Sequence, residues 1–145
     1  MSTKDLKALE RHFFTEWNKG KKAAIAAMDE AIATNNIYHR GDGENTRGLK
    51  AVKQFFSEFF DAFPDTHATL DDMVVEGDKV ALRWTLTGTH KGAFMGIPAT
   101  NKKVTIWALE IDRFAGGKIV EAWERFDTLG MMQQLGVVPT PGKGK

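Results

Sequence analysis

The stretch from Lys102 to Asp127 most restricts what this chain can fold into. It consists of two runs in which apolar and polar side chains alternate, with the dipeptide Gly116-Gly117 between them. Glycine readily adopts the positive φ angles that a two-residue hairpin turn requires, so the pattern predicts a long antiparallel hairpin. Because opposite residues of a hairpin pair in a fixed register, this turn also predicts which side chains share a face.

Helical periodicity comes first in the chain and strand periodicity later. Apolar side chains recur at spacings of three and four in three segments, which predicts helices over 2–19, 21–33 and 49–63. A short strand is predicted at 37–39 and a polar loop at 40–48. Alternation of apolar and polar residues then predicts strands over 66–76 and 79–89. A short helix is predicted at 128–135, after the hairpin.

Helices and strands that are segregated along the chain are typical of an α+β domain. We expect a strongly curved antiparallel sheet with three to four helices on its concave side, which together form a cone with a pocket at its mouth. Residues 1–136 are predicted to form this single domain. Residues 137–145 are rich in proline, glycine and lysine and are predicted to be a disordered tail.

Composition excludes several classes of function. There is no cysteine, so disulfides, thiolate metal sites and cysteine nucleophiles are absent. The net charge of +1 provides no basic field for nucleic acid. No apolar run approaches the roughly 18 residues that a membrane span needs, and the polar N-terminus lacks the apolar core of a signal peptide. We expect a cytoplasmic protein that contacts neither nucleic acid nor membrane.

Glu124 is the first candidate for a chemical role. If Ala115 pairs with Lys118 across the turn, Glu124 lies opposite Leu109, and Phe126 lies opposite Trp107. This face is otherwise apolar and is predicted to be the inner one. An isolated carboxyl group in such surroundings has a raised pKa and suits a general base. The alternative is a glutamate at the mouth of the cone that is paired with a lysine or arginine.

The opposite face of the hairpin combines charges with a tryptophan. It is predicted to carry Glu121, Trp123 and Arg125, together with Glu110 and Asp112. A tryptophan among alternating charges suits a subunit interface, so we expect a homodimer that forms through this outer face. Asp127 precedes the last predicted helix and is expected to act mainly as its N-cap.

His39 is the second catalytic candidate, because it ends a short strand where the lip of the cone is expected. A histidine there can orient a carbonyl group or relay a proton, although it can equally cap a loop. A hydrophobic or aromatic small molecule is the expected ligand, and the default alternative for its contacts is core packing. The ligand-binding candidates are Tyr38, Trp84, Phe94, Met95, Trp107, Leu109 and Phe126. The histidines are too scattered for metal-ligand spacing, so no metal is expected.

Several short motifs carry a family resemblance over about residues 48–136. They are Phe63-Pro64-Asp65, Glu76-Gly77-Asp78, Gly88-Thr89-His90, Phe94-Met95-Gly96-Ile97-Pro98, and Gly117-Lys118-Ile119-Val120-Glu121 with Trp123 and Asp127. In order and spacing, the chain resembles the SnoaL-like polyketide cyclases of the nuclear-transport-factor-2-like superfamily, whose fold is a cystatin-like roll. The family usually has Ile-Pro-Pro-Thr-Gly-Lys where this chain has Ile-Pro-Ala-Thr-Asn-Lys at 97–102, and commonly an aspartate at the position of Glu124.

The resemblance implies an aldol-type ring closure or a related isomerisation without cofactor or metal. In such a reaction a carboxylate removes a proton from a methylene group that neighbouring carbonyls activate. The superfamily also contains epoxide hydrolases and proteins that only bind a ligand or a partner. A non-catalytic ligand-binding or assembly module therefore stays open as the alternative function.

Overall fold

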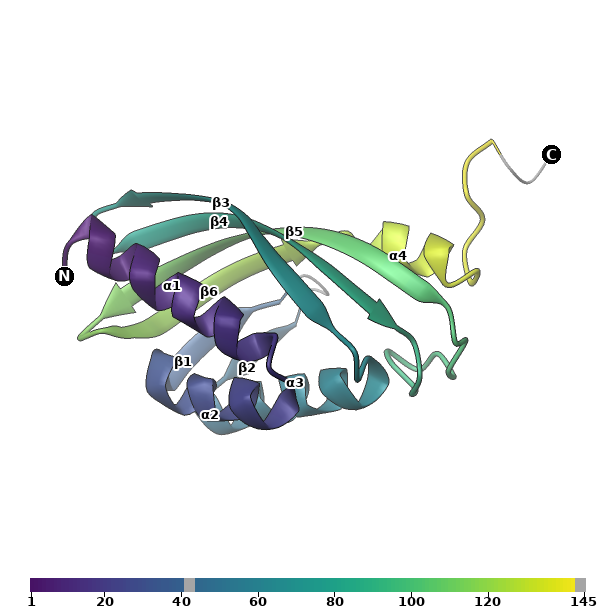
Figure 1. Ribbon diagram of the computed structural model, residues 1–145, viewed down its shortest axis with the longest axis horizontal. Helices are drawn as coiled ribbons and strands as arrows, with labels where there is room; N and C mark the ends of the chain where they lie inside the picture. Colours follow the sequence, from purple (N-terminus) through teal and green to yellow (C-terminus); the bar gives the residue numbers. More distant parts are fainter. Residues whose placement is uncertain (41–43, 143–145) are drawn as a thin grey trace.

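A computed structural model describes residues 1–40 and 44–142 of the protein. In this part of the chain, one six-stranded sheet curves around the helices, with strand order β2-β1-β6-β5-β4-β3 (Figure 1). The helices are α1 (Thr3–Trp17), α2 (Lys21–Ala31), α3 (Leu49–Ala62) and α4 (Thr128–Gln134). The strands are β1 (Ile32–His39), β2 (Asn45–Arg47), β3 (His67–Glu76), β4 (Lys79–Thr89), β5 (Lys103–Ala115) and β6 (Lys118–Phe126).

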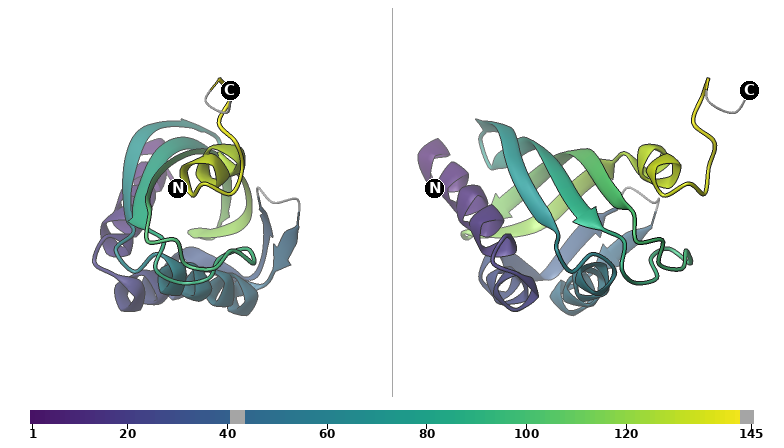
Figure 2. Two further views of the ribbon diagram at one scale, coloured as in Figure 1. Left: turned by 90° about the vertical axis from the view of Figure 1, so that its right-hand side faces the viewer. Right: turned by 45° about the vertical axis from the view of Figure 1, so that its right-hand side comes forward.

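The predicted α+β cone is confirmed. Figure 2 shows the strongly curved sheet with α2 and α3 along its open side, and α1 lies beside α2 and the edge strand β3. Amphipathic periodicity accounts for this placement, because Leu6 and Trp17 of α1, Met28 of α2, and Val52 and Phe60 of α3 are buried. The short helix α4 lies at one end of the cone, where Met131 is fully buried.

The ends of two helices follow from their capping residues. Ser2 Oγ accepts a hydrogen bond from the Asp5 N–H, and Asp5 accepts one from the Ser2 N–H, which forms a capping box at the start of α1. At α4, Asp127 accepts a hydrogen bond from the Gly130 N–H at 2.9 Å, as predicted for an N-cap.

The sheet differs from the prediction at β1. This strand is longer than the predicted 37–39 and runs parallel to β6, whereas the other strand pairs are antiparallel. The predicted sheet was antiparallel throughout because hairpins dictate that orientation for consecutive strands. No hairpin joins β1 to β6, so local sequence does not fix their relative direction. The predicted loop at 40–48 contains β2, and its residues 41–43 lie outside the described residues, as do 143–145 of the predicted tail.

The hairpin between β5 and β6 contains a one-residue irregularity. Ala115 pairs with Lys118 as predicted, and Phe114 pairs with Ile119, but Arg113 then pairs with Glu121. Val120 is therefore the extra residue of a β-bulge. Beyond it every pair is displaced by one, so that Glu124 lies opposite Glu110 rather than Leu109. The faces predicted for β5 are consequently exchanged.

Candidate active site

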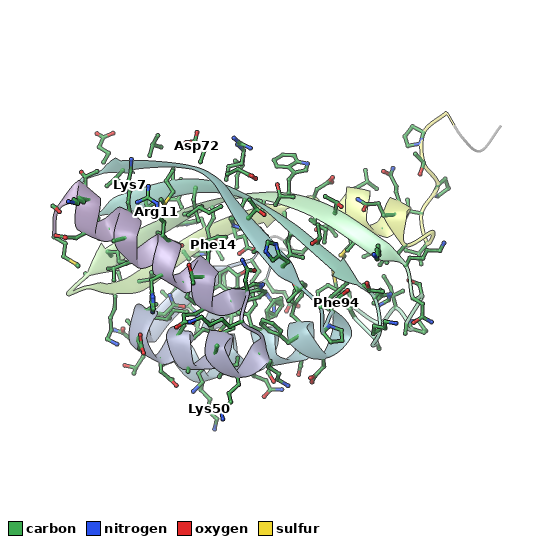
Figure 3. The ribbon with its side chains drawn as sticks, in the orientation of Figure 1. Lys7, Arg11, Phe14, Lys50, Asp72 and Phe94 are labelled. Carbon is green, nitrogen blue, oxygen red and sulfur yellow. The ribbon has the colours of Figure 1, made fainter. Side chains whose placement is uncertain are left out.

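A cavity of about 120 Å³ lies between the helices and the inner face of the sheet. Most of its lining is apolar. Figure 3 labels two of the lining side chains, Phe14 on α1 and Phe94 in the loop that follows β4. The aromatic residues of the lining are Phe13, Phe14, Trp17, Tyr38, Phe55, Phe56, Phe59, Trp84, Phe94 and Phe126. This composition suits an apolar or aromatic ligand.

Four carboxyl groups enter this cavity in a continuous hydrogen-bonded series, which we call the carboxyl chain. Glu10 of α1 bonds to Asp112 of β5, Asp112 bonds to Glu110 of the same strand, and Glu110 bonds to Glu124 of β6. Glu110 and Asp112 lie on one face because they are two residues apart in β5. Since the side-chain oxygens of ionised carboxylates only accept hydrogen bonds, each link in this series requires a shared proton.

Two neutral donors hold one end of the carboxyl chain. The Tyr38 hydroxyl donates to Glu124 Oε2 at 2.7 Å, and the Trp84 indole donates to Glu110 Oε1 at 3.0 Å. Burial, and then the charge of Glu124, raises the pKa of Tyr38 well above its usual range, so this hydroxyl keeps its proton. Tyr38 and Trp84 come from strands β1 and β4, which flank the β5–β6 hairpin.

Burial raises the pKa values of the carboxyl chain to different extents, so that some of its members are neutral and another can ionise near neutral pH. It raises the pKa of Glu110 and of Asp112 well above the usual range, and the nearby carboxylates add to this effect. It raises the pKa of Glu10 to about 7, with a hydrogen bond from Asp112 acting against the rise. At neutral pH the cavity therefore contains neutral carboxyl groups, which can donate a proton, beside a carboxyl group that can accept one.

Five of the predicted ligand-contacting or catalytic positions line this cavity. They are Glu124, Tyr38, Trp84, Phe94 and Phe126. The predicted inner position of Trp107 and Leu109 is wrong, because each is 52% exposed on the outer face of β5. Met95 is also exposed, in a loop where its φ angle is +51°. The bulge at Val120 explains the first two errors, since the prediction assumed unbroken pairing from the turn.

His39 also lies outside the cavity. Its Nε2 contacts Glu121 Oε2 at 2.7 Å, its Nδ1 contacts Asn45 Oδ1 at 3.1 Å, and its ring stacks on Trp123 at 5.3 Å. Successive side chains of a strand point to opposite faces, and Tyr38 takes the inner one. His39, which was expected at the lip of the cone, therefore lies on the outer face of the sheet with Glu121 and Trp123. Glu121 lies there as predicted, and its hydrogen bonds to His39 and Arg113 lower its pKa.

The model of the SnoaL-like polyketide cyclase family matches residues 8–135. The chain belongs to this family. Three solved structures with the same fold are TsrD from Streptomyces laurentii, AclR from Streptomyces galilaeus, described as a candidate hydroxylase, and IdmH from Streptomyces antibioticus, described as a candidate polyketide cyclase. No curated protein is significantly similar to the chain in sequence.

These three structures align over nearly their whole length. TsrD has 27% identity and a TM-score of 0.83, with 95% of this chain and 99% of TsrD covered. AclR has 27% identity and a TM-score of 0.82, with 95% and 100% covered. IdmH has 29% identity and a TM-score of 0.72, with 88% and 98% covered. The SnoaL-like domain thus accounts for nearly the whole chain.

Sequence reasoning missed three members of the carboxyl chain in this SnoaL-like protein, although each left a signal. Glu10 continues the spacing of three and four between Leu6, Phe13 and Trp17, and so lies on the buried stripe of α1. Glu110 and Asp112 alternate in register with a set of apolar residues, namely Val104, Ile106, Ala108 and Phe114, all of which are buried. Alternation counted along all of β5 places both carboxyls inside, without any reference to the turn.

No group of three or more histidine, aspartate or glutamate side chains in 1–40 and 44–142 is arranged to hold a metal ion. None of the helices described is both long and apolar enough to cross a membrane.

Proposed function

We propose that this SnoaL-like protein is a cofactor-free acid/base enzyme that acts on an enolisable, hydrophobic carbonyl compound. Ring closure of a polyketide-like substrate, or a related isomerisation, is the reaction class that the family membership favours. The observation that carries the proposal is the carboxyl chain inside an aromatic cavity. Such a cavity supplies a proton acceptor, proton donors and an apolar environment, all of which enolate chemistry needs.

Glu124 is the proposed general base. In the first step its carboxylate takes a proton from a carbon next to a carbonyl group, the C–H bond breaks, and the electron pair moves onto the carbonyl oxygen. A neutral carboxyl group, Glu110 or Asp112, donates a hydrogen bond to that oxygen. In ring closure the enolate carbon then bonds to a second carbonyl carbon, whose oxygen takes up a proton.

The remaining carboxyls give this base a route for its proton. Glu124 hydrogen-bonds to Glu110, and the series continues through Asp112 to Glu10. A proton shift across each link moves the negative charge along the series without moving any heavy atom far. The base can therefore be restored from Glu10, whose pKa of about 7 allows it to be ionised at neutral pH.

Deuterium exchange into a small cyclic ketone tests the proposal without the natural substrate. 2-Indanone carries acidic C–H groups beside its carbonyl and has the flat aromatic shape that the cavity lining suits. We expect the protein in D₂O to accelerate loss of the α-proton NMR signal in a saturable manner, relative to buffer of the same pH. If 2-indanone and a panel of 1,3-dicarbonyl, steroid and epoxide compounds all react at buffer rates, the chain is a binding module instead.

The outer face of the sheet supports a second part of the proposal, which is a homodimer. Trp107, Leu109, Ile111 and Trp123 of β5 and β6 are partly exposed on this face and are here called the outer patch. Ile111 and Trp123 are directly opposite one another in the sheet. Charged residues of both signs surround the patch, including Arg83, Arg113 and Glu121. A two-fold contact between equal patches buries these apolar groups and lets opposite charges meet, so a second copy of the chain is the proposed partner.

Trp107→Glu is expected to weaken this dimer, because a tryptophan that becomes buried in an interface is a common binding hot spot. Native mass spectrometry across a dilution series should give a dissociation constant raised by about tenfold or more, which corresponds to roughly 1.4 kcal/mol or more. Leu129→Glu on α4 is the matched control, since Leu129 is also exposed but lies outside the outer patch. A monomeric wild-type protein, or equal weakening by both variants, contradicts the proposed interface.

A further inference from the structure

The polar groups that line the cavity include more unpartnered hydrogen-bond acceptors than unpartnered donors. Apart from the links within the carboxyl chain, Glu10 Oε1, Asp112 Oδ1 and Asn36 Oδ1 are buried and receive no hydrogen bond within the described residues. The lining also contains one unpartnered donor from α1, Trp17 Nε1. The Tyr38 hydroxyl and the Trp84 indole are already occupied by Glu124 and Glu110. A ligand with hydrogen-bond donor groups therefore complements the lining better than a ligand with acceptor groups.

Asn36 is independent of the carboxyl chain and points to the same conclusion. It lies in β1, is only 2% exposed and lines the cavity. Its Nδ2 donates to the Ile119 carbonyl oxygen at 3.4 Å, and a reversed amide would bring two acceptors together there. The amide orientation is thus fixed, and Oδ1 remains as a buried acceptor without a donor.

The charges that face the cavity are all of one sign. Glu10 faces it from α1, Glu110 and Asp112 from β5, and Glu124 from β6, while Tyr38 of β1 is neutral. Among the described residues that line the cavity, none is lysine, arginine or histidine. When Glu10 ionises, no lysine, arginine or histidine of the described lining balances its charge, and such a buried charge is costly.

Arginine is present nearby but its charge is engaged elsewhere. The Arg40 guanidinium lies over the Phe55 ring at 4.4 Å, and its Nη2 donates to Glu44 at 2.9 Å. Arg40 is not part of the cavity lining, although its charge acts on Tyr38. Within residues 1–40 and 44–142, the lining near Glu10 and Asp112 includes no lysine, arginine or histidine.

We propose that the cavity binds an apolar compound with a protonated amine, whose ammonium group lies against Glu10, Asp112 and Asn36. An ammonium group supplies three donors and one positive charge, and the described lining offers no cation to Glu10, Asp112 or Asn36. The aromatic rings around it add cation–π attraction. The inference rests on the cavity of the proposed function and names a class of substrate for it, but it does not depend on enolate chemistry.

Three ligands of nearly equal shape test the inference: benzylamine, benzyl alcohol and benzoate. The indole N–H signals of the four tryptophans report where each ligand binds, because Trp17 and Trp84 line the cavity whereas Trp107 and Trp123 belong to the outer patch. At pH 8 we expect benzylamine to shift the Trp17 and Trp84 signals and to bind about tenfold more tightly than benzyl alcohol. Benzoate should bind most weakly.

The preference for the amine should follow the charge of the cavity. Benzylamine stays protonated at both pH 5.5 and pH 8, whereas the pKa of Glu10 of about 7 makes the carboxyl chain gain charge between these values. The advantage of benzylamine over benzyl alcohol should therefore shrink at pH 5.5. Glu10→Gln and Asp112→Asn should reduce it at pH 8, and a smaller change in the affinity for benzyl alcohol than for benzylamine shows that the cavity has kept its shape. Glu121→Gln, on the outer face, should leave both affinities unchanged.

Two results overturn the inference. One is benzyl alcohol or benzoate binding as tightly as benzylamine at pH 8. The other is an amine preference that survives the Glu10→Gln and Asp112→Asn substitutions together. Because binding is measured without turnover, an amine preference combined with no exchange into 2-indanone rejects the proposed catalysis but keeps the ligand class. Exchange into 2-indanone without an amine preference rejects the ligand class but keeps the proposed catalysis.

Discussion

Glu124→Gln is expected to lower the protein-catalysed exchange of 2-indanone by about 10²- to 10⁴-fold, the usual contribution of a general base. Glutamine cannot take the α-proton, but its side-chain oxygen can still accept the Tyr38 hydrogen bond seen at 2.7 Å. The substitution thus removes the proton acceptor while it retains the size of the side chain. The exchange rate by proton NMR in D₂O, measured at several ketone concentrations, should show the loss in kcat.

Glu121→Gln provides a matched control for this experiment. It is the same chemical change on the same strand, three residues away, but Glu121 lies on the outer face with His39 and Arg113. Its exchange rate should equal that of the wild type. Equal rates for Glu124→Gln and the wild type would mean that another group removes the proton. Glu10 is then the next candidate, because its pKa of about 7 suits a base at neutral pH.

The second large effect concerns stability and pH. The pKa of Glu10 is raised from 4.5 to about 7 in the folded protein, so folding favours its protonated form. The associated stability is present below about pH 4.5 and is lost as the pH rises through 7. For Glu10 this amounts to roughly 3 kcal/mol. The raised pKa values of Glu110 and Asp112 act in the same direction. Urea unfolding should therefore show a free energy of unfolding that falls from pH 5 to pH 8.

Glu10→Gln should reverse much of this loss. Glutamine has nearly the same shape and stays neutral, so the variant should be more stable than the wild type at pH 8 and should depend less on pH. Glu58→Gln, at an exposed position of α3, should leave the pH profile of the wild type unchanged. A wild-type free energy of unfolding that is constant between pH 5 and pH 8 would show that the carboxyl chain does not hold its protons in the way proposed.

Local signals in the sequence were sufficient for the fold and for part of the site. Gly116-Gly117 predicted the hairpin and the Ala115–Lys118 pair, and the position of Asp127 predicted a helix cap. Glu124 was placed on the inner face correctly, because apolar neighbours on its own strand, Ala122 and Phe126, share that face. These inferences depend only on residues close together in the chain.

The misplaced parts of the site depend on an irregularity within the hairpin and on contacts between distant residues. The bulge at Val120 leaves no mark in composition, so counting pairs from the turn assigned Glu110 and Asp112 to the wrong face. The parallel pairing of β1 with β6 decides that Tyr38 meets Glu124, and no hairpin specifies it. Glu10 lies 100 residues or more before its partners on β5, so only the packing of α1 against the sheet brings these carboxyls together.

The extra residue at position 120 has a consequence for how such a protein can vary. Adjacent residues of β6 serve different environments, with Trp123 facing outward to the proposed partner and Glu124 facing inward to the proposed substrate. Because Arg113 already pairs with Glu121, deletion of Val120 alone would remove the bulge and keep both environments. Deletion of Ala122 would instead exchange them, sending the carboxyl into the interface and the tryptophan into the cavity. Point substitutions can change the inner and outer surfaces separately, whereas a change in strand length beyond the bulge must alter both at once.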